Sequence, residues 1–151
     1  VLADALVRAG EDEPDVIIDV ATLTGAQMVA LGNRISAVMG NDDELRDDIV
    51  HSAAMVGEQF WPMPLPVELR ESLDSPIADI ANIGDRMGGM LTAGLFLQDF
   101  ISDDTAWAHL DIAGPAFNEA APHGYTPKGG TGVAVRTLVQ IVRDLADSNS
   151  L

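Results

Sequence analysis

The chain has 151 residues, 47% of them hydrophobic and 21% charged, which is the composition of one folded globular domain rather than of a disordered segment. Lys and Arg number 8 against 24 Asp and Glu, and the net charge of −16 argues against nucleic acid as a partner, because its backbone is also anionic. Cysteine is absent, which excludes disulfides, thiolate catalysis and cysteine-ligated metals and fits a reducing cytoplasm, and no apolar run approaches the ~20 residues that a membrane span needs.

The first part of the chain predicts a helix, a strand and a second short helix. Residues 1–9 have helical spacing and stop at Gly10, but no capping residue or initiator Met precedes them, so we expect the chain to be part of a longer protein. Residues 16–21 are a short β-branched run typical of a buried strand, and residues 26–32 have helical character. The intervening residues 22–25 leave the carboxyl end of that strand, which is where ligands tend to bind in open α/β sheets.

The middle of the chain continues the alternation. Residues 35–39 predict a strand, and either Asn41 or Asp42 is placed to cap a helix over residues 43–58. Residues 60–66 contain too many prolines for a central strand and predict an extended segment at the edge of a sheet.

The next segments mix short elements with one long helix. Residues 67–73 predict a short helix and residues 77–83 a short strand. Residues 84–89 form a glycine-rich loop, which an apolar helix over residues 91–101 follows. Residues 107–113 then predict another strand.

The chain closes with a long loop over residues 114–130 and a helix over residues 132–145. Strands that alternate with helices in this way are typical of the α/β class. We therefore predict a mixed, mostly parallel sheet flanked by helices.

The glycine-rich loop at residues 84–89 superficially resembles a phosphate-binding loop. It lacks the Lys-Ser/Thr ending of that motif, and Lys128 is the only lysine in the chain. Because glycine loops more often serve tight turns, we favour a structural role for this segment.

Three polar side chains lie on predicted strands. His109 and Asp111 are two positions apart and share one face of a strand, a spacing that could bind a metal or relay a proton. A buried hydrogen-bonded pair is the interpretation we favour. Asp19, which stands alone near a strand end, is similarly interpreted as a structural hydrogen-bond acceptor rather than a general base.

The amino-acid sequences of several segments, and the order of these segments along the chain, resemble those of leucyl (cytosol) aminopeptidases. The matching segments are residues 1–8, 16–26, 78–84, 91–97 and 107–114, together with the Gly-Gly-Thr-Gly turn at residues 129–132. They span almost the whole chain in the order of that family, which is more specific than any one motif. The resemblance implies that residues 1–151 are the C-terminal part of one aminopeptidase catalytic domain, without the N-terminal domain.

The same resemblance implies where the catalytic groups lie. In this family an Asn-Thr-Asp-Ala-Glu-Gly-Arg signature, with two metal ligands and the catalytic arginine, directly precedes the helix that begins here at Val1. The other metal ligands and the catalytic lysine lie further upstream. We therefore expect no catalytic residue and no metal ligand in this chain. Two divalent ions, zinc or manganese (cobalt is also possible), are expected in the full-length enzyme and none at a defined site in this fragment.

The resemblance assigns six substrate-binding positions to this chain: Thr22, Leu23, Gly25, Ile83, Ala113 and Ala116. The backbone of the first three is implied to contact the peptide amine and the bond to be cleaved, a role that suits fixed peptide dipoles. The two alanines correspond to the pocket for the N-terminal side chain, and Ile83 to a position beside the leaving residue. We predict that residues 22–25 and 113–116 lie side by side at one crevice.

The implied activity is removal of N-terminal residues from peptides by metal-activated water. The resemblance also implies hexamers, peptide substrates and a cytoplasmic location, with no nucleic acid or membrane partner. Two alternatives remain: a non-catalytic relative that serves as a scaffold or peptide-binding module, and an unrelated α/β binder of small molecules or phosphate. An intact upstream metal-ligand signature would separate the enzyme from the scaffold, and an anion bound near residues 84–89 would favour the last alternative.

Overall fold

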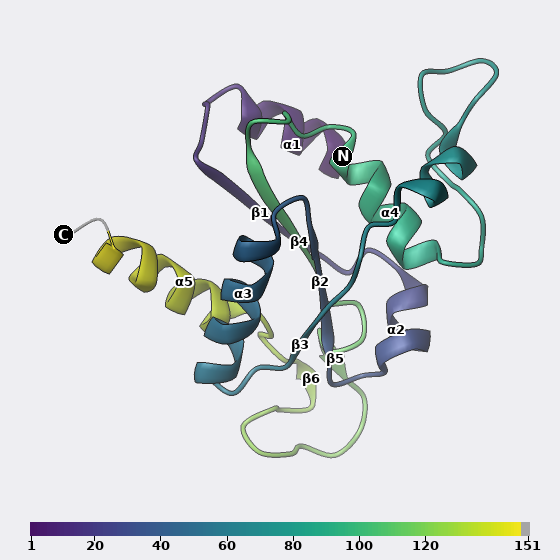
Figure 1. Ribbon diagram of the computed structural model, residues 1–151. Coiled ribbons are helices and arrows are strands. Elements are labelled where there is room, and N and C mark those ends of the chain that lie inside the picture. Colours follow the sequence, from purple (N-terminus) through teal and green to yellow (C-terminus); the bar gives the residue numbers. More distant parts are fainter. Residues whose placement is uncertain (149–151) are drawn as a thin grey trace.

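A computed structural model describes residues 1–148 and shows a sheet with helices on both faces (Figure 1). The four strands have the order β1 (Val16–Ala21), β4 (Ala106–Asp111), β2 (Ser36–Gly40) and β3 (Phe60–Pro62). The pairs β1–β4 and β2–β3 are parallel and β2–β4 is antiparallel. The predicted fold class, a mixed and mostly parallel sheet flanked by helices, is confirmed.

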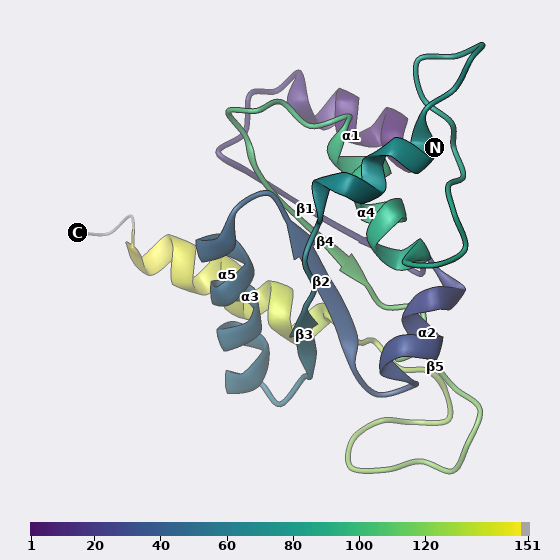
Figure 2. The same ribbon diagram turned by 45° about the vertical axis from the view of Figure 1, so that its right-hand side comes forward.

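The helices divide between the two faces of the sheet (Figures 1 and 2). On one face lie α1 (Leu2–Gly10), α2 (Gly25–Leu31) and α4 (Gly89–Gln98), which cover Ile17, Met39 and Trp107. On the other lie α3 (Asp43–Met55) and α5 (Val135–Ser148), which cover Val38, Ala108 and Leu110. Strands with apolar residues facing both layers are what a buried α/β sheet requires. Within residues 1–148 no helix is long and apolar enough to cross a membrane.

The predicted edge segment and helix cap can be checked directly. The proline-rich segment forms β3 at one edge of the sheet, where Pro62 costs no central ladder hydrogen bond. Asp42, not Asn41, caps α3 by accepting a hydrogen bond from Leu45 N–H (2.8 Å). Asn41 instead joins two segments, since it accepts from Trp107 N–H and donates to the Thr105 carbonyl.

Other elements differ from the predictions in length or kind. The helix predicted over residues 43–58 ends at Met55, shortly before Gly57 adopts a φ of 73°. Residues 67–73 form the 3₁₀ helix η1 (Val67–Leu73). The long loop over residues 114–130 contains a short antiparallel pair, β5 (Phe117–Asn118) with β6 (Gly129–Gly130).

The strand predicted for residues 77–83 is wrong. This stretch is a series of bends, and its Ile77 is 95% exposed. The segment protrudes from the body beyond η1, so it has no neighbouring strand with which to pair (Figure 2). An apolar run becomes a strand only where the fold offers it a ladder.

Candidate functional site

The carboxyl ends of β1 and β4 lie side by side at one edge of the sheet. The two strands are parallel and in register, with Ala21 opposite Asp111. The ladder continues one step further, because Ile112 N–H donates to the Ala21 carbonyl (2.9 Å). Residues 22–25 and 113–116 therefore leave neighbouring strands in the same direction. The prediction that these two segments lie side by side is confirmed, and that they form one crevice for a ligand stays a prediction.

Asp111 fastens these two segments together. Its buried carboxylate accepts from Leu23 N–H through Oδ1 (3.1 Å) and from the Thr24 hydroxyl through Oδ2 (2.8 Å). Oδ1 also accepts from Ala113 N–H (3.2 Å). One carboxylate thus satisfies donors on both turns, and hydrogen bonds to an ionised acceptor are stronger than neutral ones. Asp111 fixes the backbone of the crevice.

Gln27 provides a second connection between the same turns. Thr24 caps α2 by accepting from Gln27 N–H, which directs the Gln27 side chain inward (3.0 Å). The fully buried Gln27 accepts from Gly114 N–H (2.7 Å) and donates to the Ile35 carbonyl (2.6 Å). A Cβ at position 114 would collide with the Gly32 carbonyl, so only glycine fits there.

No pattern in the sequence indicated the role of Gln27. A glutamine among apolar residues at the start of a helix is compatible with many positions, and its two partners are distant in the sequence. The Thr-x-x-Gln spacing of Thr24 and Gln27 does match a capping box, and this signal could have marked the start of the helix.

The interpretation of Asp19 as a structural acceptor is confirmed. It lies opposite His109 in the register of β1 and β4, and its carboxylate accepts from His109 Nδ1 and from Trp107 Nε1 (2.7 Å). The predicted hydrogen-bonded pair of His109 with Asp111 is wrong, because each binds a different partner. Residues two apart on a strand are separated by ~6.6 Å, whereas neighbours across strands are ~4.8 Å apart. His109 therefore bonds to its cross-strand neighbour Asp19 rather than to Asp111 on its own strand.

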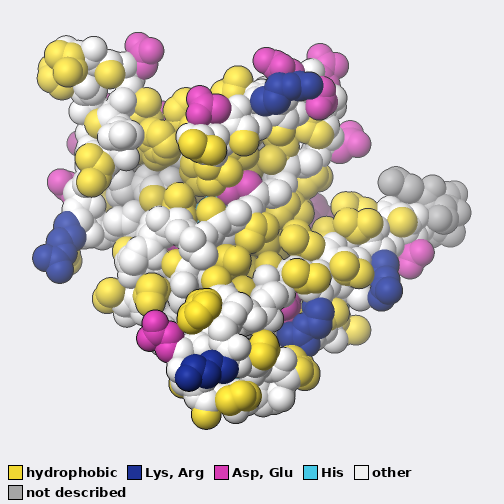
Figure 3. Space-filling model, turned by 180° about the vertical axis from the view of Figure 1, so that it is seen from behind, with side chains coloured by type: hydrophobic (Ala, Val, Ile, Leu, Met, Phe, Trp, Pro, Cys, Tyr) yellow, Lys and Arg dark blue, Asp and Glu magenta, His cyan; other side chains and the backbone are white. Residues whose placement is uncertain are grey.

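An apolar cavity of about 680 Å³ opens beside the crevice. Its lining residues come from the start of α1, from the β1–α2 turn, from residues 82–86 and from α4; they include Leu2, Leu23, Thr24, Ile83, Arg86 and Phe96. Viewed from behind, the protruding segment stands beside a hollow with a largely hydrophobic floor (Figure 3). The structure thus brings Leu23 and Ile83 to one cavity.

The remaining predicted positions lie outside that lining. Thr22 and Gly25 are exposed, and Ala113 and Ala116 are half-buried on the neighbouring turn. Ile83 is 80% exposed, and the backbone near it is held by a hydrogen bond from Ala81 N–H to the Leu73 carbonyl (2.8 Å). The crevice is therefore well fixed on the strand side and open on the side of the protruding segment.

An ion pair joins η1 to α4, two elements that contribute Leu73 and Leu97 to the cavity lining. Arg70 on η1 donates through Nε (2.8 Å) and Nη2 (2.7 Å) to Asp99 at the end of α4. The hydrogen bond to Asp99 raises the pKa of Arg70 above its ordinary value. The glycine-rich loop between these elements contains Gly88 with a φ of 70°, which supports its interpretation as a tight turn.

Residues 1–148 contain no group of three or more His, Asp or Glu side chains arranged to hold a metal ion. The Asp19–His109 pair and Asp111 are buried in two separate hydrogen-bond networks. The donors of this part of the chain therefore do not fit a two-metal centre, and what the site offers is backbone polar groups beside an apolar cavity.

Several curated proteins and solved structures are similar to this chain. A probable cytosol aminopeptidase of Streptomyces avermitilis is 67% identical over 141 residues, which are 93% of this chain and 28% of that protein. A relative from Mycobacterium leprae with the same description is 55% identical over 148 residues, again 28% of its length. The chain thus spans between a quarter and a third of the relatives it matches.

The solved structures agree. The bottromycin maturation enzyme BotP superposes with a TM-score of 0.93 at 45% identity, covering 97% of this chain and 32% of that one. A mutant of tomato leucine aminopeptidase gives a TM-score of 0.87 at 41% identity, covering 93% and 27%. The model of the cytosol aminopeptidase family, catalytic domain, matches residues 1–139, and the chain therefore belongs to this family.

Proposed function

We propose that this chain forms the substrate-binding wall of a metallo-aminopeptidase that releases N-terminal residues from peptides. The observation that carries the proposal is the joining of residues 22–25 to residues 113–116 by the buried Asp111 carboxylate, in a chain of the cytosol aminopeptidase family. This arrangement presents rigid backbone at the edge of an apolar cavity, which suits a ligand whose backbone is polar and whose side chains are often apolar.

The polar part of the wall is backbone. Leu23 N–H is already donated to Asp111, so the carbonyl of Leu23 is the group left to accept a hydrogen bond from the peptide amine. Thr22 and Gly25 flank it with exposed peptide groups. Because Asp111 and Gln27 hold these turns, the dipoles are oriented before the peptide arrives and need no reorganisation.

The apolar part of the wall selects side chains. Ala113 and Ala116 are small, and we propose that they leave room for the N-terminal side chain of the peptide. Ile83, which lines the 680 Å³ cavity with Leu23, is proposed to contact the residue on the leaving side. Burial of an apolar substrate side chain there contributes about 25 cal/mol per Å² of apolar area.

The metal ions are proposed to belong to the rest of the protein. One of the structures that this chain resembles is BotP in complex with Mn. Two divalent ions, Zn²⁺ or Mn²⁺, would require carboxylate donors that residues 1–148 do not group together. The role proposed for this chain is therefore to bind and orient the peptide.

The wider setting is proposed from the same family membership. We propose that residues 1–151 are the C-terminal part of one catalytic domain, that the full-length protein assembles as a hexamer and that it acts in the cytoplasm. The coverage of about 28% of the relatives supports the first statement, and their name, cytosol aminopeptidase, supports the last.

Leucinamide hydrolysis tests the function. The full-length protein supplied with Mn²⁺ or Zn²⁺ is expected to release leucine and to lose activity when a chelator removes the ions. The chain of residues 1–151 alone is expected neither to turn over leucinamide nor to bind two ions saturably. A full-length protein that binds peptides without hydrolysing them would instead indicate a non-catalytic peptide-binding module, and turnover by residues 1–151 alone would refute the assignment of the metal ligands.

A further inference from the structure

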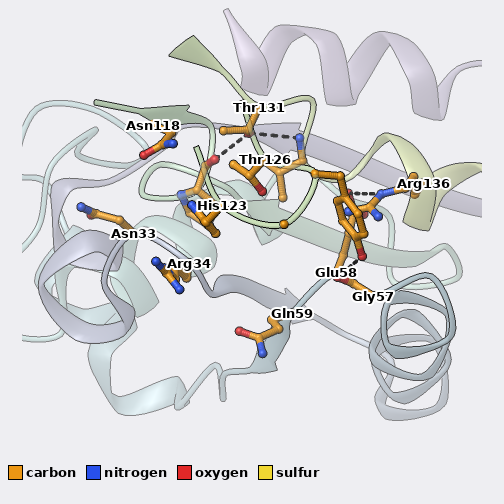
Figure 4. A pocket seen from close by; sticks show the side chains of 14 residues that line it. Asn33, Arg34, Gly57, Glu58, Gln59, Asn118, His123, Thr126, Thr131 and Arg136 are labelled. Atoms are coloured by element: carbon orange, nitrogen blue, oxygen red, sulfur yellow. Dashed lines mark hydrogen bonds and ion pairs between the residues drawn. The ribbon is translucent and has the colours of Figure 1, made fainter. Parts of the chain in front are cut away.

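A second cavity, of about 470 Å³, lies on another part of the molecule (Figure 4). Four segments line it: the α2–β2 turn, the α3–β3 turn, the loop over residues 114–131 and the start of α5. Its polar lining residues include Asn33, Arg34, Glu58, Gln59, His123 and Arg136. None of the six proposed peptide-binding positions lines it, and it shares only Pro115 with the turn at residues 113–116.

Arg34 is the unusual member of this lining. Arg8, Arg46, Arg70 and Arg136 each pair with a carboxylate, whereas Arg34, Arg86 and Arg143 have no such partner among the described residues; of these three only Arg34 lines this cavity. Arg34 forms no hydrogen bond or ion pair with any part of the chain that the structure describes, although 24 acidic residues are present against 8 basic ones. Its guanidinium therefore offers an uncompensated charge and up to five N–H donors at the cavity.

Glu58, the acidic residue of the lining, does not neutralise Arg34. It is 6% exposed, and its Oε1 accepts from Ala134 N–H (3.1 Å). Its Oε2 accepts from Thr137 N–H (3.0 Å) and from the Thr137 hydroxyl (2.5 Å), so it caps the beginning of α5. Arg136 Nε lies 3.5 Å from Oε1. Its oxygens are thus engaged, and its charge is balanced by Arg136 and the helix N-terminus.

The loop over residues 114–131 and the start of α5, which both line the cavity, are also held in place. The Arg136 guanidinium stacks 4.0 Å from the centre of the Tyr125 ring, and the Tyr125 hydroxyl donates to the Gly57 carbonyl (3.4 Å). Asn118 fastens the other end of the loop by donating to the Pro127 carbonyl (3.0 Å). In Figure 4 the labelled His123 and Arg34 are toward one side of the cavity and Glu58 is toward the other. The donors near Arg34 therefore face a preformed space.

We propose that this cavity binds a small oxyanion, a carboxylate or a phosphate, with Arg34 as the charged donor and Asn33, Gln59 and His123 beside it. A guanidinium matches both kinds of oxyanion in a two-pronged geometry. The acidic residues elsewhere in the protein repel anions at long range. We therefore expect an anion to bind at this cavity rather than elsewhere on the surface, because Arg34 supplies a local positive charge here. The proposal does not depend on peptidase activity.

Calorimetric titration of the full-length protein with inorganic phosphate, and separately with succinate, tests the proposal. Saturable binding of at least one anion is expected, and the preferred one identifies the source as phosphate or carboxylate. Arg34→Gln is expected to weaken binding roughly 10- to 100-fold, the effect of losing a charge-assisted hydrogen bond. Arg34→Lys keeps the charge without the planar fork and is expected to lose less. Binding is also expected to weaken as NaCl is raised.

Arg143→Gln is the matched control, because it removes the same charge from the exposed surface of α5, outside the cavity lining. It is expected to bind as the unmodified protein does. Equal affinity in the unmodified protein and Arg34→Gln would place the anion elsewhere, for example on the metal ions, and would overturn the proposal. Absence of saturable binding of both anions would also overturn it. Thermal unfolding of each variant verifies that the fold is retained.

Discussion

The two sides of the crevice proposed to bind peptides are built in opposite ways. On the strand side, the turn residues 22–25 and 113–116 are joined by Asp111 and Gln27, which are both fully buried and hydrogen-bonded to both turns. On the other side, residues 74–88 protrude from the body and carry exposed Ile77, Ile83 and Met87. Buried polar anchors give one side a single backbone conformation, whereas exposed apolar residues contribute contact area without fixing the segment.

The largest expected effect comes from removing the anchor of the rigid side. Asp111→Ala leaves two N–H groups and the Thr24 hydroxyl without their acceptor, and we expect it to lower the free energy of unfolding by about 3–5 kcal/mol. Urea unfolding of the full-length protein measures this change. Asp103→Ala, at an exposed position, is the control and should be nearly neutral. A loss of less than 1 kcal/mol for Asp111→Ala would show that water replaces the carboxylate.

A smaller loss of stability is expected when a methyl group is added at position 114. Gly114→Ala places its Cβ against the Gly32 carbonyl and close to Gln27 Oε1, and overpacking of this kind costs about 1–3 kcal/mol. Gly130→Ala meets no atom within 4 Å and is the matched control. If both variants unfold at the same urea concentration, the close approach at position 114 is not a constraint. Gly114→Ala is also expected to raise the KM of the full-length protein for leucinamide.

The smallest effect on stability is expected on the protruding side. Ile83→Ala removes a side chain that is 80% exposed, so the free energy of unfolding should change by no more than about 0.5 kcal/mol. Its KM should nevertheless rise for dipeptides with an apolar second residue, while the KM for leucinamide, which lacks that residue, stays the same. An equal rise for both substrates would contradict the assignment of Ile83 to the leaving side.

Sequence reasoning succeeded where a local pattern was sufficient. The β-branched run at residues 16–21 is β1, and the two turns of the crevice meet because parallel strands deliver their carboxyl ends to the same edge. It failed where the partner had to be known. Residues 77–83 are apolar enough for a strand but no strand lies beside them, and the alignment of His109 with Asp19 depends on β1 being the neighbour of β4.

The anion cavity could not be predicted for the same reason. Arg34 carries no motif, and its isolation from carboxylates is a property of four segments that meet only in the fold. The capping of α5 by Glu58 is equally non-local, because Glu58 and Thr137 are 79 positions apart. Composition could indicate only that unpaired arginines are unexpected in so acidic a chain.

The pairing of β1 with β4 also determines when the crevice can form during folding. Leu23 and Asp111 are 88 positions apart, so their hydrogen bond closes a long loop of the chain. The loss of chain entropy on closing this loop opposes formation of the bond. Parallel pairing across such a separation is slow compared with formation of the helices. During synthesis, the turn at residues 22–25 leaves the ribosome before Asp111 does, and until then its Leu23 N–H and Thr24 hydroxyl lack the acceptor that they have in the folded chain. The joining of residues 22–25 to residues 113–116 therefore follows the pairing of β4 with β1.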